Sequence, residues 1–408
     1  MAAKLQAEIG ELCEIHTTDS RTVLGEAIGF HDGLTQILPY TACHGIRSGL
    51  TIRGLGRRLS IPTGDGLMGR VINGLGQPID GKGDLHCHER VEVESVTPPP
   101  ALERPRIAQP LVTGLRVVDS LLTFGLGQRI ALLSGSGVGK STFLGEIAKA
   151  SSADVNVVAL IGERGREVKP FIDDCLGDEG LRKSIVVVAT SDEQPLMRVR
   201  AANSAMAIAN QLRAQGKNVL FLFDSITRLA TSQREIGLSL GEPPTLRGFT
   251  PSVFQMMSNL LEQMGTSDRG SVSAVISVLV EGGDFDEPVC DSVRSIVDGH
   301  IVLDRELAEH GHYPAVNVAR SLSRVFRDIT DVKHQDAATK IRDALATYAE
   351  VEDLLRVGAY QTGTSFQIDQ AVRLKSTIDD FVKQKVNEQS SFSDTIQRMV
   401  AIASHWTD

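Results

Sequence analysis

The chain has 408 residues, of which 41% are hydrophobic, and its 42 Lys and Arg against 51 Asp and Glu give a formal net charge of −9. This length suffices for two or three domains with large cores, and the acidic balance disfavours sequence-independent binding to nucleic acid. The longest apolar run, at 272–280, is too short to cross a bilayer, and the first residues, MAAKLQAE, lack the apolar core of a secretory signal. We therefore expect a cytoplasmic, multi-domain protein.

The cysteines do not indicate a disulfide framework or a metal site. They stand far apart, at positions 13, 43, 87, 175 and 290, and none forms a Cys-x-x-Cys pair. An odd and widely spaced set is typical of reduced cytoplasmic thiols. His86-Cys87-His88 has the residue types of a metal site, but no second ligand cluster accompanies it, so we interpret it as an exposed turn.

The N-terminal part is rich in short strand-forming runs separated by glycine-containing turns, at 12–15, 23–28, 35–38 and 69–72. Strands at this spacing predict a small barrel or sandwich, which we assign to residues 1–96. The proline-rich segment 97–110 follows as a stiff, extended linker.

Residues 111–331 alternate apolar strands with helices, a pattern that predicts an α/β domain with a mostly parallel sheet covered on both faces. Amphipathic helices are predicted at 195–215 and 251–264. The strands are predicted at 129–133, 155–161, 185–189, 219–223, 271–280 and 300–303.

The segment 134–141, SGSGVGKS, is the most informative part of the chain. It lies between a predicted strand and a predicted helix, which is the context of a phosphate-binding P-loop, although the strict pattern has glycine where Ser134 stands. Glycines permit a tight turn whose N–H groups face phosphate oxygens, and the helix presents its positive end to the same phosphates. Lys140 is predicted to reach the β- and γ-phosphates and the Ser141 hydroxyl to bind Mg²⁺. The nucleotide-binding residues predicted here are Gly135, Ser136, Gly137, Val138, Gly139, Lys140, Ser141 and Thr142.

Two acidic residues follow neighbouring predicted strands. Asp224 ends the strand at 218–223 and is placed to hold Mg²⁺ opposite the P-loop. Glu163 follows the strand at 155–161 and is placed to polarise a water for attack on the γ-phosphate, although its position alone fits a surface helix cap equally well. Arg164 is predicted to touch the γ-phosphate or to brace Glu163, with a structural ion pair as the alternative.

Residues 332–408 have a helical pattern with long polar-faced segments at 335–355 and 368–386. We expect a separate C-terminal helical domain.

Three motifs carry a resemblance to a known family: LIGERGREV at 160–168, GEPPT at 241–245 with PSVF at 251–254, and VRSIVDGHIVL at 293–303. The chain resembles the bacterial type III protein-export ATPases, which are related to the catalytic subunits of rotary ATP synthases, from about Gly10 to beyond Leu355. The segment SDEQPLMR at 191–198 is similar to the flagellar branch, with the virulence-injectisome branch as the alternative.

The resemblance implies a RecA-like core that hydrolyses ATP with Mg²⁺. By position, Glu163 would activate the water, Asp224 would complete the Mg²⁺ shell, Tyr313 would stack on adenine and Arg324 would be the arginine finger. Without the family match, Arg324 would be interpreted as a surface arginine. Because one chain carries both Glu163 and Arg324, the resemblance implies a homo-hexamer with each site at a subunit boundary.

The family also implies partners and a location. Its C-terminal domain contacts chaperone–substrate complexes and a coiled-coil central stalk, and its ring lies in the cytoplasm against the export gate of the inner membrane. Nucleic acid is not an expected partner. The family begins with further strands, whereas this chain starts nine residues before Gly10. We expect either an incomplete barrel with an unpaired strand edge or a start assigned too far downstream.

Three other functions are weaker interpretations. A rotary or vacuolar-type catalytic subunit shares the site chemistry, but those machines divide the finger and the catalytic glutamate between two chains. A hexameric RNA helicase would need an aromatic and basic stripe, which residues 1–96 lack. A regulatory subunit that only binds nucleotide is disfavoured by the intact set of Lys140, Glu163 and Asp224.

Overall fold

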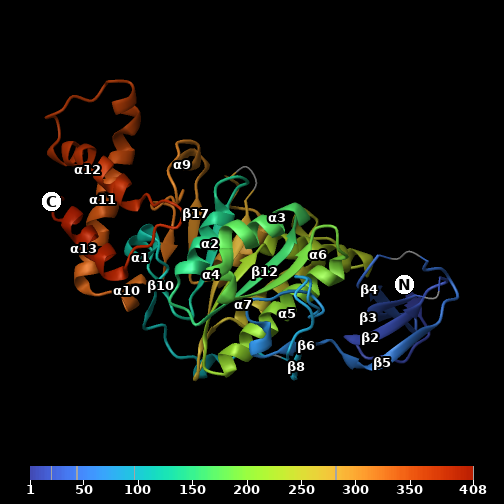
Figure 1. Cartoon of the computed structure of the whole chain (residues 1–408). Helices are drawn as coiled ribbons and strands as arrows, with labels where there is room; N and C mark the ends of the chain where they lie inside the picture. The colour runs from blue at the N-terminus through green and yellow to red at the C-terminus, as the bar shows by residue number, and fades with distance from the viewer. Residues whose placement is uncertain (20, 43–44, 96, 281–282, 408) are drawn as a thin grey trace.

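A computed structural model describes residues 1–19, 21–42, 45–95, 97–280 and 283–407. Cys43 and residues 96 and 408, the predicted ends of the first and last domains, lie outside this part of the chain. The molecule is elongated: the N-terminal sheet and the C-terminal helices lie at opposite ends of a central sheet with its helices (Figure 1).

The N-terminal part is a small antiparallel β-structure in the strand order β1-β4-β3-β2-β5. Its core contains the fully buried side chains of Cys13, Ile15 and Ile37. The β3–β4 hairpin turns at Asp32-Gly33, where positive φ angles of 48° and 73° suit the right-handed twist of the two strands. The predicted N-terminal barrel is confirmed in this region. Its strands are β1 (Ala2–Ala3), β2 (Glu11–His16), β3 (Thr22–His31), β4 (Leu34–Pro39) and β5 (Ile52–Arg58).

One strand that we assigned to the barrel belongs elsewhere. The run at 69–72 contributes to β7 (Val71–Asn73), which pairs in parallel with β13 (Ser184–Thr190) and forms one edge of the central sheet. The nearby strands β6 (Ser60–Thr63) and β8 (Glu89–Glu92) form a separate two-stranded ribbon. Ile72 is fully buried in the core of the central domain. A two-residue apolar run carries no alternation from which its partner sheet could be inferred, so the prediction was wrong.

The central sheet has nine strands, and the order of its main path is β18-β17-β11-β16-β14-β12-β13-β7. The strands of its middle pair in parallel, as the continuous apolar runs predicted. Among the described residues of this sheet, only the short strands β15 and β18 pair antiparallel. The predicted α/β fold is confirmed. The other strands of this sheet are β11 (Arg129–Ser134), β12 (Val155–Glu163), β14 (Asn218–Asp224), β15 (Gly265–Thr266), β16 (Ser271–Leu279), β17 (Gly299–Leu303) and β18 (Leu322–Ser323). A separate two-stranded sheet pairs β9 (Pro110–Leu111) with β10 (Phe124–Gly125).

Helix α5 (Pro195–Ala214) departs from the predicted amphipathic pattern, because nearly its whole circumference is buried. One side packs on β12 and β13, and β6, β8 and α6 cover others. Its polar residues are therefore buried as well, among them Arg198, Arg200 and Arg213. The other helices of the central part are α1 (Arg116–Leu121), α2 (Lys140–Ala150), α3 (Gly165–Pro170), a π-helical turn η3 (Phe171–Leu176), α4 (Gly177–Arg182), α6 (Ile226–Ser239), α7 (Pro251–Glu262), α8 (Pro288–Ile296), α9 (Arg305–Glu309) and α10 (Phe326–Ile329).

Three helices form the C-terminal end: α11 (Val332–Arg356), α12 (Phe366–Val382) and α13 (Phe392–Ala403). The side chains of Asp331, Ser365 and Ser391 accept backbone N–H groups at their first turns, the N-cap interaction that starts a helix. The helical C-terminal domain is thereby confirmed, whereas the residue numbers of the domain borders stay predictions.

A buried ion pair ties the N-terminal sheet to the central domain. Arg200 of α5 donates from Nε to Glu26 Oε2 of β3 at 2.8 Å, and the Tyr40 hydroxyl also donates to the Glu26 carboxylate. Arg200 pairs with Glu94 on its other side at 2.5 Å. Removing one partner of a buried ion pair strongly destabilises the folded state, because the other charge then stays buried without compensation.

We therefore expect Glu26→Gln to lower the free energy of unfolding by about 3 kcal/mol, because Arg200 would remain buried with half of its counter-charge. Urea unfolding followed by circular dichroism measures the change. Glu8→Gln is the control, since the Glu8 carboxylate pairs with Arg58 at 3.5 Å but is 81% exposed. Equal midpoints for the two variants would contradict the structural role of this junction.

Candidate active site

The P-loop lies between β11 and α2, where the sequence predicted it. Gly137 and Gly139 have φ angles of 78° and 86°, which L-residues with side chains rarely adopt. A Cβ atom at Gly137 would meet no atom within 4 Å, whereas one at Gly139 would lie 3.3 Å from the Tyr313 ring. The loop is thus an open cradle on one side and is covered by Tyr313 on the other.

Two neighbouring cavities open on this loop and share Gly137, Gly139 and Thr142. The first has a volume of about 1030 Å³, and the second about 850 Å³. The first is lined by charged groups from several elements: Lys140, Glu163, Arg164, Glu167, Arg228, Asp304, Arg305 and Arg320. The second is lined by Val138, Tyr313 and a C-terminal segment that includes Lys383, Gln384, Lys385 and Arg398.

Lys140 and the two predicted acidic residues come together at the carboxyl edge of the sheet. The Lys140 ammonium lies 2.5 Å from Asp224 Oδ1 and 3.4 Å from Glu163 Oε1. Burial raises the pKa of the Glu163 carboxyl and Asp224 raises it further, while Lys140 and Arg228 act in the opposite direction. Burial alone would lower the pKa of Lys140, but the two carboxylates outweigh it and the net shift is upward. Glu163 is therefore a stronger base than an exposed glutamate.

The first cavity fits a triphosphate with a hard cation. Two side chains that line it, Ser134 and Arg228, have a buried donor, the Ser134 hydroxyl and Arg228 Nε, with no hydrogen-bond partner among the described residues. Asp224 and Ser141 supply the oxygen ligands that Mg²⁺ prefers. Within the described ranges no group of three or more His, Cys, Asp or Glu could hold a metal alone. This donor set suits an ion that binds through substrate phosphates rather than an all-protein metal site.

The second cavity brings distant parts of the chain to Tyr313. This ring is 45% exposed, and the backbone N–H of Gln384 donates to the Tyr313 carbonyl at 2.8 Å. Asn387 N–H donates to Glu146 of α2 at 2.8 Å. The segment after α12 therefore forms a wall of this cavity. Sequence reasoning missed it, because nothing in its residue types indicates that it lies beside the P-loop.

The structure separates the two predicted arginines. Arg164 lines the first cavity, and its guanidinium also pairs with Glu167 at 3.2 Å, so the structural ion pair that we weighed exists. Arg324 lines neither cavity. It is exposed after β18, on the edge of the sheet beyond β17, and its Nη2 lies 3.4 Å from the carbonyl of Arg294.

Sequence reasoning also missed three arginines of the first cavity, Arg228, Arg305 and Arg320. Arg228 lies one helical turn after Asp224, and that spacing from the end of a strand was an available signal. Arg320 stacks its guanidinium over the Phe285 ring at 4.4 Å, an arrangement that only the fold reveals. Together with Lys140 and Arg164 they make the cavity attractive to phosphate.

Comparison with known proteins identifies the family. The model of the ATP synthase alpha/beta family nucleotide-binding domain matches residues 114–323, its beta-barrel domain matches 3–56, and the T3SS EscN ATPase C-terminal domain matches 330–401. The flagellum-specific ATP synthase of Treponema pallidum is 49% identical over 96% of this chain and 87% of its own length. The type 3 secretion system ATPase of Xanthomonas euvesicatoria is 42% identical over 98% and 90%.

A solved structure agrees over nearly the whole length. The assembled ATPase EscN of the enteropathogenic E. coli type III secretion system, in complex with its central stalk EscO, has a TM-score of 0.90 and 40% identity, covering 98% of this chain and 96% of that one. The chain belongs to the family of flagellar and type III secretion ATPases. The prediction of a type III export ATPase is confirmed, and so is its ATP-hydrolysing class. In the described part of this ATPase, no helix combines the length and hydropathy needed to span a membrane.

Proposed function

We propose that this ATPase is the ring motor of a flagellar export apparatus and couples ATP hydrolysis to chaperone release and substrate export. The flagellar assignment is supported by the segment 191–198. The identities to flagellar relatives, 42–49%, overlap those to secretion relatives, 42–44%, and favour neither branch. Export of virulence proteins is the second candidate. The single observation that supports hydrolysis best is the cluster of Lys140, Glu163 and Asp224 beside the P-loop.

In the proposed reaction, ATP lies with its phosphates in the first cavity and adenine against Tyr313 in the second. Loop N–H groups and Lys140 hold the phosphates, and Glu163 accepts a proton from the attacking water. Arg164 and Arg228 offset negative charge on the transferred phosphoryl group. Ser141 and Asp224 would hold Mg²⁺, which neutralises phosphate charge when it is bound.

Arg324 is proposed to act on the site of a neighbouring copy. It is exposed and lies outside the cavities of its own chain, as a finger supplied in trans requires. The relative EscN is described as assembled and as bound to a central stalk. For this chain we propose a homo-hexamer that binds a coiled-coil stalk, chaperone–substrate complexes and the export gate, in the cytoplasm at the inner membrane.

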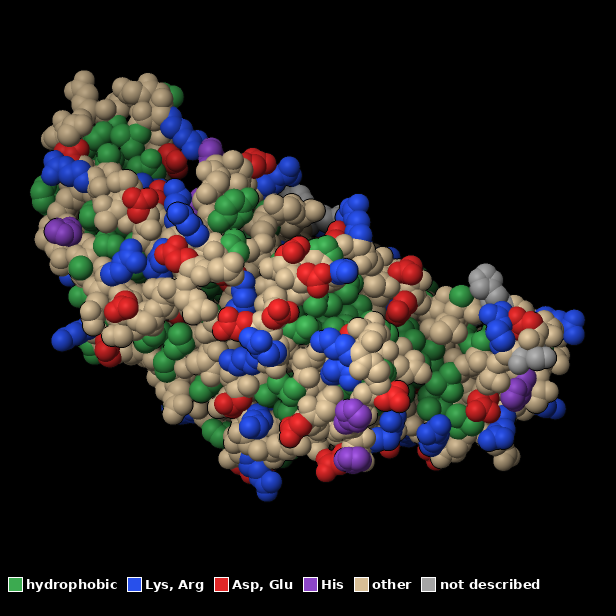
Figure 2. Space-filling model, in the orientation of Figure 1, with side chains coloured by type: hydrophobic (Ala, Val, Ile, Leu, Met, Phe, Trp, Pro, Cys, Tyr) green, Lys and Arg blue, Asp and Glu red, His purple; other side chains and the backbone are tan. Residues whose placement is uncertain are grey.

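Nucleic acid is not part of the proposal. On the face shown in Figure 2, Lys and Arg side chains are interspersed with Asp and Glu and form no continuous basic stripe. Such a mixed surface lacks the electrostatic pattern that nucleic-acid backbones favour.

Glu163→Gln should retain ATP binding and lose nearly all hydrolysis, because the amide keeps the size of the carboxylate but cannot accept the proton of water. Fluorescent-nucleotide binding and phosphate release measure the two properties separately. Turnover within threefold of the wild type would remove Glu163 from the mechanism.

Arg228→Met should shift the acid side of the pH–rate profile to higher pH. The Arg228 charge lowers the pKa of Glu163, so its removal raises that pKa, and Glu163 must be ionised to act as a base. The measurement is kcat/KM for ATP between pH 5 and 9. An unchanged midpoint would show that Arg228 does not affect the pKa of Glu163.

Arg324→Ala should lower turnover by about 10³-fold with unchanged ATP affinity, because a finger acts on the transition state. In the wild type, specific activity should rise with protein concentration as subunits assemble. Specific activity that stays constant on dilution to isolated subunits would contradict a site shared between copies.

A further inference from the structure

The backbone around Arg324 is anchored although its side chain is exposed. The Arg324 N–H donates to the Asp298 carbonyl at 2.9 Å. Gln128 Nε2 donates to the same carbonyl and to Ser323 Oγ, each at 3.0 Å. The Ser323 hydroxyl in turn donates to the Thr123 carbonyl at 2.9 Å. The backbone from which Arg324 extends is therefore anchored directly to the Asp298 carbonyl, and the adjacent Ser323 is bonded to Gln128 and Thr123.

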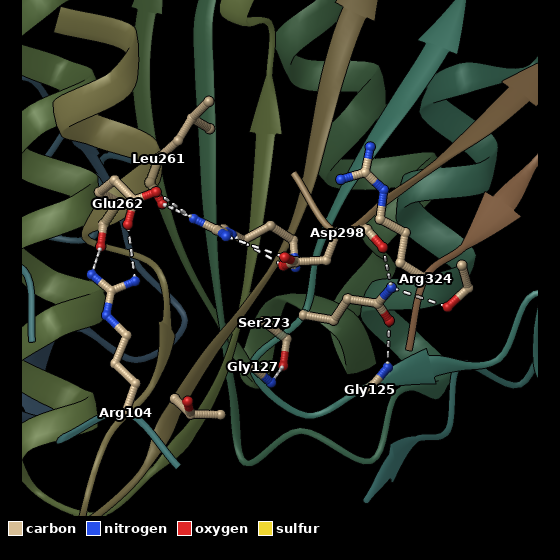
Figure 3. A network of polar contacts seen from close by, with 12 residues as sticks. Arg104, Gly125, Gly127, Leu261, Glu262, Ser273, Asp298 and Arg324 are labelled. Carbon is tan, nitrogen blue, oxygen red and sulfur yellow. Dashed lines mark hydrogen bonds and ion pairs between the residues drawn. The ribbon is translucent and has the colours of Figure 1, made fainter. Parts of the chain in front are cut away.

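Asp298 is held by Arg129, the first residue of the P-loop strand β11. The Arg129 backbone N–H donates to Asp298 Oδ2 at 3.0 Å. The guanidinium adds two parallel bonds, Nε to Oδ2 and Nη2 to Oδ1, both at 3.1 Å. Two parallel bonds of this kind fix the direction of a carboxylate as well as its distance. In Figure 3 the Arg324 side chain points away from this network. Its Nη2 donates to the Arg294 carbonyl at 3.4 Å, and the residue is exposed.

The Arg129 side chain is itself held from its other side. Its Nη1 donates to Glu262 Oε1 at 3.1 Å, and Glu262 Oε2 accepts from Arg104 Nη1 at 3.0 Å (Figure 3). The Arg129 side chain is only 13% exposed. A guanidinium paired with two carboxylates has little freedom to rotate, so Arg129 is a rigid support.

Arg129 lies too far from the nucleotide cavities to act there. β11 runs from Arg129 to Ser134 and places the P-loop at its opposite end, a distance of about 17 Å for a strand of that length. Arg129 lines neither cavity. Any effect on catalysis must therefore pass through another residue.

We propose that Arg129 is a positioning residue for the arginine finger: by clamping Asp298 it holds Arg324 where a neighbouring copy can use it. The inference rests on the proposed role of Arg324 in trans. It follows that the subunit that donates the finger anchors it to β11, the strand that carries its own P-loop. Because a displacement of about 1 Å can cost two orders of magnitude in rate, loosening the clamp should lower turnover.

Mixed rings of two full-length variants test this, because they separate the finger donor from the catalytic subunit. The donor carries Glu163→Gln, so that its own site is inactive and its finger is intact. The acceptor carries Arg324→Ala, so that its site is intact and its finger is missing. Each variant alone should be nearly inactive. An equimolar mixture should recover activity at acceptor sites that face a donor finger.

Arg129→Lys is then added to one partner at a time. Lysine keeps the charge between Asp298 and Glu262 but cannot form the two parallel bonds. On the donor it should lower kcat of the mixture at least tenfold, with KM for ATP unchanged. On the acceptor, whose finger is absent, activity should stay within twofold. Asp298→Asn on the donor should behave like Arg129→Lys.

Arg70→Lys on the donor is the matched control. Arg70 forms the same two-bond pair with Asp80, at 2.7 and 2.9 Å, and is equally buried, but it has no bond to the finger loop. The control mixture should keep its activity.

The outcomes are distinct. An equal loss of activity with Arg129→Lys on the donor and on the acceptor would assign Arg129 to folding or to its own P-loop and would overturn the proposal. Full activity with Arg129→Lys on the donor would also overturn it. A parent mixture that stays inactive, with both variants shown to co-assemble, would instead refute the shared site and remove the basis of the inference.

Discussion

The ion cluster of Lys140 with Asp224 and Glu163 depends on the parallel register of three strands. β12 pairs with β14 so that Leu160 lies opposite Asp224, and Glu163 follows after a register irregularity at Gly162. Gly162 has a φ of 72°, and a Cβ atom there would lie 2.7 Å from Cβ of Arg228. Glycine thus lets α6 approach the end of β12. Every proposed step of hydrolysis requires this meeting of strand ends at the P-loop.

The same sheet places the two halves of the proposed shared site on different sides of the molecule. Glu163 ends β12, whereas Arg324 follows β18, which lies at the far edge beyond β11 and β17. A single chain therefore presents its P-loop cavity and Arg324, the proposed finger, in different places. In a closed ring of identical copies, a heterologous contact joins one to the other. The Arg129–Asp298 pair connects the backbone of Arg324 to the P-loop strand β11.

The C-terminal helices contribute to the nucleotide site through the segment that follows α12. Arg116 of α1 donates from Nε to the Phe381 carbonyl at 2.7 Å, and its backbone N–H donates to Gln384 Oε1 at 2.9 Å. Gln384 also bonds the Tyr313 carbonyl. The helical end is thus attached next to Tyr313, where we propose that adenine binds.

The sequence by itself determined the parts of this protein whose signal is local. A P-loop needs glycines followed by Lys140 and Ser141 within one turn, buried parallel strands need continuous apolar runs, and the family motifs are contiguous. These features therefore predicted the fold class, the export ATPase family and the positions of Glu163 and Asp224. Only the tertiary structure decided that β7 joins the central sheet, that α5 is buried on nearly all sides, and that Arg228, Arg320 and the segment after α12 line the cavities. These features depend on contacts between residues far apart in the chain. Such contacts produce no periodic pattern in the sequence of either of the two segments that pack together.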